Sequence, residues 1–77
     1  MSNYLVFNYP MTDDRDAEKI TTLLNKLEGG VYNVKIDVQG NRVSLQTNHV
    51  KNDVLTKLLF SGKPVFYNEE ETKLGPR

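Results

Sequence analysis

Carboxylates dominate the one short stretch of this sequence whose residue types suit binding chemistry. The stretch runs from Tyr9 to Asp16, and its last four positions contain three aspartates, Asp13, Asp14 and Asp16. Carboxylate oxygens bind hard divalent cations, and at the start of a helix they cap free backbone amides. They also suit an acidic contact with a basic partner. Helix capping needs no ligand and suffices to explain the stretch, but the residues alone leave all three uses open.

The rest of the chain gives no support for catalysis. It contains no cysteine, so it has neither a thiolate nucleophile nor a soft metal ligand. Its single histidine, His49, lies in a polar connection that we expect at the opposite end of the sheet from the aspartates, as a solvated loop residue. Without a histidine partner or an apolar pocket, the aspartates lack the surroundings that activate a general acid or base. We therefore expect no catalytic residues and no enzymatic activity.

The composition is that of a small soluble domain. Ten basic and ten acidic side chains give a net charge of zero, and 38% of the 77 residues are hydrophobic. Zero net charge disfavours nucleic acid and anionic lipid as partners. No apolar run approaches the roughly 20 residues of a membrane helix, and no basic leader precedes an apolar segment. We expect a cytoplasmic monomer without membrane insertion.

Two kinds of hydrophobic period alternate along the chain. Residues with period two predict strands over 3–9, 31–38, 42–47 and 64–67. Apolar residues spaced by three and four predict a helix over 14–28 and a second helix that carries Val54, Leu55, Leu58 and Leu59. The order βαββαβ is typical of the ferredoxin-like α+β fold, a four-stranded antiparallel sheet with two helices on one face. We assign residues 1–68 to a single domain and residues 69–77 to a polar, flexible tail.

Period two also predicts which side chains face the helices. In the first strand, Leu5, Phe7 and Tyr9 share one face, and Tyr4 points to the other. In the second strand, Val34, Ile36 and Val38 share one face.

Several stretches together resemble one family. They are Met11-Thr12, Ala17-Glu18-Lys19-Ile20, Leu23, Leu27, Gly30-Val31, the run from Val34 to Val38, and Ser61-Gly62-Lys63. This pattern covers about residues 4–67 and resembles the heavy-metal-associated (HMA) domain of small copper chaperones and metal-pumping ATPases. The resemblance implies the βαββαβ fold and a Met-x-Cys-x-x-Cys loop before the first helix, with the methionine packed beneath it.

The sequence departs from this family at the metal ligands. Aligning Met11 with the family methionine puts Asp13 and Asp16 where the two cysteines belong. Copper(I) prefers sulfur, so we expect no copper and no cofactor, and two carboxylates would hold a divalent ion only weakly. Lys63 matches a lysine near the family's metal loop, and beside Asp13 or Asp16 it would replace the charge of the metal. Natural loss of the cysteines and deliberate replacement would leave the same sequence.

Two functions follow from the resemblance. The first is an interaction module, a metallochaperone relative with a degenerate metal site, that docks through the exposed sheet or through loop residues Met11, Thr12, Asp14 and Lys63. Its partner would be a protein, such as a metal-transport ATPase or another HMA-like domain. The alternative is a metal-ion-binding protein that uses the three aspartates for a hard or borderline divalent ion.

Other families that share the element order fit less well. RNA-recognition domains stack bases on aromatic side chains of the first and third strands, but here the third strand presents Arg42, Ser44 and Gln46 on that face. An acidic turn would repel the phosphate that acylphosphatases bind. The glycine-bearing ligand interface of amino-acid-sensing ACT domains is not recognisable in this sequence.

Overall fold

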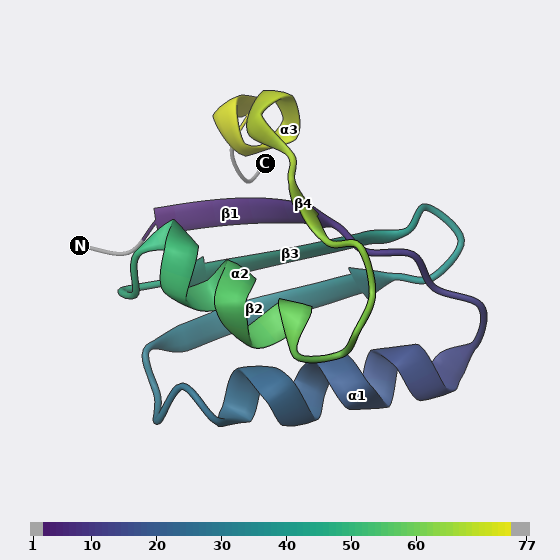
Figure 1. Cartoon of the computed structure of the whole chain (residues 1–77). Coiled ribbons are helices and arrows are strands. Elements are labelled where there is room, and N and C mark those ends of the chain that lie inside the picture. Colours follow the sequence, from purple (N-terminus) through teal and green to yellow (C-terminus); the bar gives the residue numbers. More distant parts are fainter. Residues whose placement is uncertain (1–2, 75–77) are drawn as a thin grey trace.

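The computed structural model describes residues 3–74, so residues 75–77 of the predicted tail lie outside the described residues. In chain order the elements are β1 (Asn3–Asn8), α1 (Asp14–Asn25), β2 (Val31–Asp37), β3 (Arg42–Thr47), α2 (Lys51–Leu59), β4 (Phe66–Tyr67) and α3 (Glu69–Leu74) (Figure 1). The strand order is β2-β3-β1-β4, and all three neighbouring pairs are antiparallel. The predicted ferredoxin-like α+β fold is confirmed. Within the described range, no helix has the length and apolar character needed to cross a membrane.

The hydrophobic core lies between one face of the sheet and the helices α1 and α2. Every second residue of the central strands is buried there, and both helices contribute a stripe spaced by three and four. The buried members from these elements are Leu5, Phe7, Ile20, Leu23, Leu24, Val43, Leu45, Val54 and Leu58. Leu59, predicted in the second stripe, is instead 45% exposed because it is rotated by about 100° from Leu58 around the helix.

A β-bulge changes the predicted faces of β2. The β2–β3 register shifts between Tyr32 and Lys35, where Asn33 has a positive φ of 52°. An extra residue in one strand resets the alternation of faces beyond it. Ile36 and Val38 therefore pack against the core as predicted, but Val34 is 39% exposed. The prediction that Val34 shares their face is wrong for this reason.

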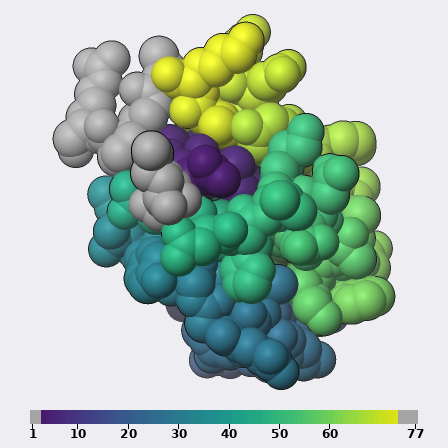
Figure 2. Space-filling view, turned by 90° about the vertical axis from the view of Figure 1, so that its left-hand side faces the viewer, coloured from purple at the N-terminus to yellow at the C-terminus, as the bar shows by residue number. Residues whose placement is uncertain are grey.

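Residues 69–74 form the helix α3, where the sequence predicted a polar, flexible tail. The Asn68 side chain accepts a hydrogen bond from the Glu71 amide at 2.9 Å, and the Thr72 hydroxyl accepts one from the Val6 amide at 2.9 Å. Glu71 also forms an ion pair with Arg42 at 3.2 Å. Figures 1 and 2 show α3 beside β1, on the opposite side of the domain from α1. The polar composition of residues 69–77 led to the prediction of a tail. Composition does not reveal the contacts that hold α3 against residues far away in the sequence.

Candidate functional site: the acidic turn

The acidic turn, residues 9–16, connects β1 to α1 and is anchored by the β2–β3 hairpin. Asn41 of the hairpin turn accepts hydrogen bonds from the Tyr9 amide at 2.8 Å and, through its side-chain oxygen, from the Met11 amide at 2.9 Å. Asn41 has a positive φ of 54°, a conformation that asparagine tolerates well. The Met11 side chain is buried in the core cluster. Sequence reasoning missed Asn41, whose only signal is its place in a Gly-Asn turn.

Asp13 and Asp16 form a capping box at the start of α1. Asp13 is the N-cap residue, and its carboxylate accepts a hydrogen bond from the Arg15 amide at 2.9 Å. Asp16, three residues later, accepts hydrogen bonds through Oδ2 from the Thr12 amide at 2.8 Å, the Thr12 hydroxyl at 3.2 Å and the Asp13 amide at 3.5 Å. This reciprocal arrangement satisfies amides that the helix itself leaves without acceptors.

Lys63 lies beside the same carboxylate. Its Nζ is 3.6 Å from Oδ1 of Asp16, whose side chain is largely buried. The hydrogen bond from the Thr12 amide is the main cause that lowers the pKa of Asp16. Partial burial opposes this effect, while the Thr12 hydroxyl, the Asp13 amide and the charge of Lys63 add to it. Asp16 is therefore ionised at neutral pH, with both oxygens in contact with protein donors.

The third aspartate does not join this network. Asp14 is exposed in the first turn of α1, where its charge suits the positive end of the helix dipole. Within residues 3–74, no group of three or more His, Cys, Asp or Glu side chains is arranged to hold a metal ion. The oxygen donors of Asp13 and Asp16 do not fit copper(I), which prefers sulfur, and Oδ2 of Asp16 already accepts hydrogen bonds from Thr12 and Asp13.

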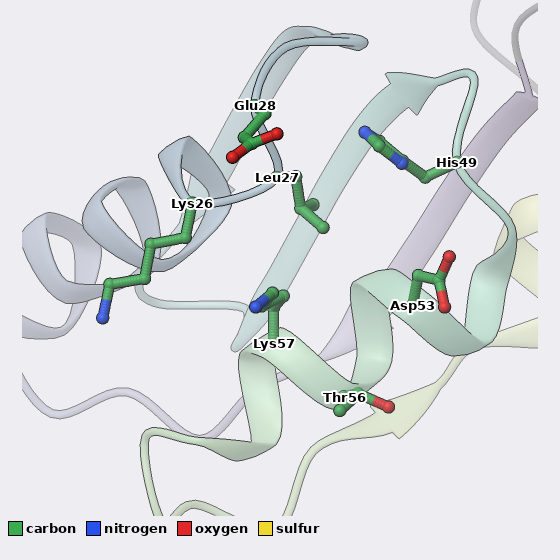
Figure 3. Close-up of a pocket in the computed structure, with 7 residues that line it drawn as sticks. All are labelled: Lys26, Leu27, Glu28, His49, Asp53, Thr56 and Lys57. Carbon is green, nitrogen blue, oxygen red and sulfur yellow. The ribbon is translucent and has the colours of Figure 1, made fainter.

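A separate pocket of about 410 Å³ lies between the end of α1 and α2 (Figure 3). His49 lines this pocket, and its Nε2 contacts the Gly29 carbonyl oxygen at 2.8 Å. Two lysines and two acidic residues also line it, namely Lys26, Lys57, Glu28 and Asp53. The Lys26 side chain points away from the others in Figure 3. These opposing charges give the pocket no clear ligand preference, and His49 supplies no ligand to the acidic turn.

Comparison with known proteins supports the fold. No protein-family profile matches the sequence, and no curated protein sequence matches it significantly. Among solved structures, the chain is similar to the apo form of the HMA domain of the copper chaperone for superoxide dismutase, with a TM-score of 0.78. The match has 19% sequence identity and covers 88% of this chain and 68% of that chain. The chain thus has the fold of an HMA domain.

Proposed function

We propose that the protein is a non-catalytic interaction module in which an internal polar network stands where HMA domains bind a metal. The observation that carries this proposal is the environment of Asp16. Its carboxylate accepts hydrogen bonds from Thr12 and Asp13 and lies beside Lys63, so both of its oxygens already have partners within the protein.

The alignment on Met11 relates this network to the metal loop of the HMA family. If Asp13 and Asp16 replace the two cysteines of the family motif, they convert a metal loop into a capping box on the same backbone. The ammonium group of Lys63 then supplies a positive charge beside the turn, as a bound metal ion would. Copper carriage is therefore not proposed for this chain, and within residues 3–74 no cluster of three or more possible ligands favours a hard-ion site.

We propose a protein as the partner of this chain. The chain has no net charge to attract nucleic acid, and it lacks the cysteines needed for thiolate chemistry. The outer face of the sheet, opposite α1 and α2, exposes Tyr32 and Val34 at 48% and 39%. The partner we propose is a metal-transport ATPase or another HMA-like domain, as the resemblance implies.

Metal titrations followed by amide NMR shifts at residues 11–17 test this proposal. Copper(I), zinc and calcium should produce no saturable shift in the natural chain. The double variant Asp13→Cys/Asp16→Cys is the positive control, and it should gain copper(I) binding if the backbone of the turn matches that of the family. Saturable shifts at Asp13 and Asp16 of the natural chain would overturn the proposal, and a folded double variant that does not bind copper(I) would contradict the alignment.

A further inference from the structure

The outer face of the sheet carries a hollow made of two adjoining pockets of about 380 and 280 Å³. The larger pocket is lined by Tyr4, Asn33, Val34, Lys35 and Gln46. The smaller pocket shares Tyr4 and Lys35 with it and extends to Asp37, Arg42 and Glu71. We call this combined surface the outer-face hollow. Its larger pocket lies within the size range of ligand sites, roughly 300–1,000 Å³.

The bulge in β2 builds the wall of this hollow. Asn33 adopts its positive φ there, and its side-chain amide donates a hydrogen bond to the Gln46 side-chain oxygen across the sheet. Tyr4 and Gln46 are paired residues of β1 and β3 and share the outer face. With Val34 turned toward this face, an aliphatic and an aromatic side chain line the same pocket. An apolar group would gain favourable burial there.

The two pockets of the hollow differ in the charged residues that line them. Arg42 is paired with Glu71 at 3.2 Å, and the Asp37 carboxylate accepts a hydrogen bond from the Gly40 amide at 3.0 Å, within the hairpin turn. Lys35 lines both pockets, is exposed, and forms no ion pair within residues 3–74. The hydrogen bond from Gly40 leaves the negative charge of Asp37 in place, so charges of both signs line the smaller pocket. Among residues 3–74, Lys35 is the charged residue that lines the larger pocket, where it lies beside the apolar wall.

We infer that the outer-face hollow docks a protein segment that presents an aromatic or large apolar side chain next to a carboxylate. The apolar side chain packs between Tyr4 and Val34, and the carboxylate pairs with Lys35. This inference rests on the proposed interaction function and assigns it to the sheet face rather than to the acidic turn.

A pair of short peptides tests the inference, acetyl-Gly-Phe-Glu-Gly-amide and its analogue with Gln in place of Glu. Each is titrated into the full chain while amide NMR shifts are recorded. The Glu peptide should give saturable shifts at Tyr4, Val34, Lys35 and Gln46. The Gln peptide should bind about two- to five-fold more weakly, which is the range expected for an exposed ion pair.

Two lysine variants separate the local ion pair from general charge attraction. Lys35→Gln should remove the preference for the Glu peptide, because the cation that lines the larger pocket is lost. Lys26→Gln should keep the preference, since Lys26 is also an exposed lysine but lines the separate pocket between α1 and α2. Amide spectra show whether each variant is folded.

Four outcomes would overturn the inference. The first two are the absence of saturable shifts with the Glu peptide and equal affinity for both peptides. The third is peptide shifts confined to residues 11–17, which would place docking at the acidic turn and leave the interaction function standing. The fourth is stronger binding of oligouridylate at Tyr4 and Tyr32, which would replace protein docking with nucleic-acid binding. Saturable metal shifts at residues 11–17 would instead contradict the proposed function by a separate readout.

Discussion

Replacing Tyr9 with phenylalanine should stabilise the protein. Tyr9 is fully buried, and its hydroxyl has no hydrogen-bond partner among the described residues. A buried polar group without a partner costs about 1–3 kcal/mol of folding free energy. Phenylalanine keeps the ring and loses only the oxygen contacts, each worth about 0.1–0.2 kcal/mol. We therefore expect Tyr9→Phe to raise the free energy of unfolding by about 1 kcal/mol, and at most about 2 kcal/mol.

Urea unfolding, followed by far-ultraviolet circular dichroism, measures this change. For a small domain with an m value of about 1–3 kcal/mol/M, the midpoint should rise by about 0.3–1 M while m stays constant. Tyr32→Phe is the control, because Tyr32 is 48% exposed and its hydroxyl accepts a hydrogen bond from the Asn48 side-chain amide at 3.3 Å. This substitution should not raise the free energy of unfolding and should lower it by no more than about 1 kcal/mol. A lower midpoint for Tyr9→Phe would refute the reasoning, since it would show that the hydroxyl makes a favourable bond in the folded protein.

Three further substitutions, two of them with a control variant, test the core and the turn by the same urea assay. Leu58→Ala should cost about 2–5 kcal/mol because Leu58 is fully buried, whereas Leu59→Ala should stay within about 0.5 kcal/mol. Similar losses at both positions would contradict the assigned helix face. Asp13→Ala should cost about 0.5–2 kcal/mol through loss of the N-cap, and Asp14→Ala, which removes no cap bond, should cost less. An equal or larger loss for Asp14→Ala would refute the capping role of Asp13. Because the folded state lowers the pKa of Asp16, the resulting stability is present above the ordinary pKa of 3.8 and is lost as pH falls through the folded value. Asp16→Asn should flatten this loss as the pH falls below about 4, and an unchanged slope would contradict it.

The sequence predicts the central fold because its signals are local and repeated. The alternation at Val43 and Leu45 and the spacing of Ile20, Leu23 and Leu24 identify buried faces without any knowledge of distant contacts. The bulge at Asn33 breaks this regularity, because asparagine at a positive φ leaves no periodic signal. α3 was missed for a related reason, since its anchoring partners are far away in the sequence.

In the candidate site, too, the local features could be predicted from the sequence and the long-range contacts could not. Helix capping was one of three uses that the sequence left open for the aspartates, and the structure shows it as the capping box of Asp13 and Asp16. From the family resemblance, Lys63 could replace the charge of the metal only if it lay beside Asp13 or Asp16. In the structure it lies beside Asp16. The Asn41 anchor could not be predicted because it lies 30 residues from Met11 and acts through side-chain geometry.

The most direct test of the internal network is an NMR titration of the Asp16 side-chain carboxyl carbon against pH, recorded with and without zinc. Donors from Thr12, Asp13 and Lys63 should hold the pKa of Asp16 below its ordinary value of 3.8, and zinc should leave the titration curve unchanged. A pKa at or above 3.8 in the metal-free protein, or a curve that zinc displaces, would contradict the claim that the acidic turn is complete without a metal.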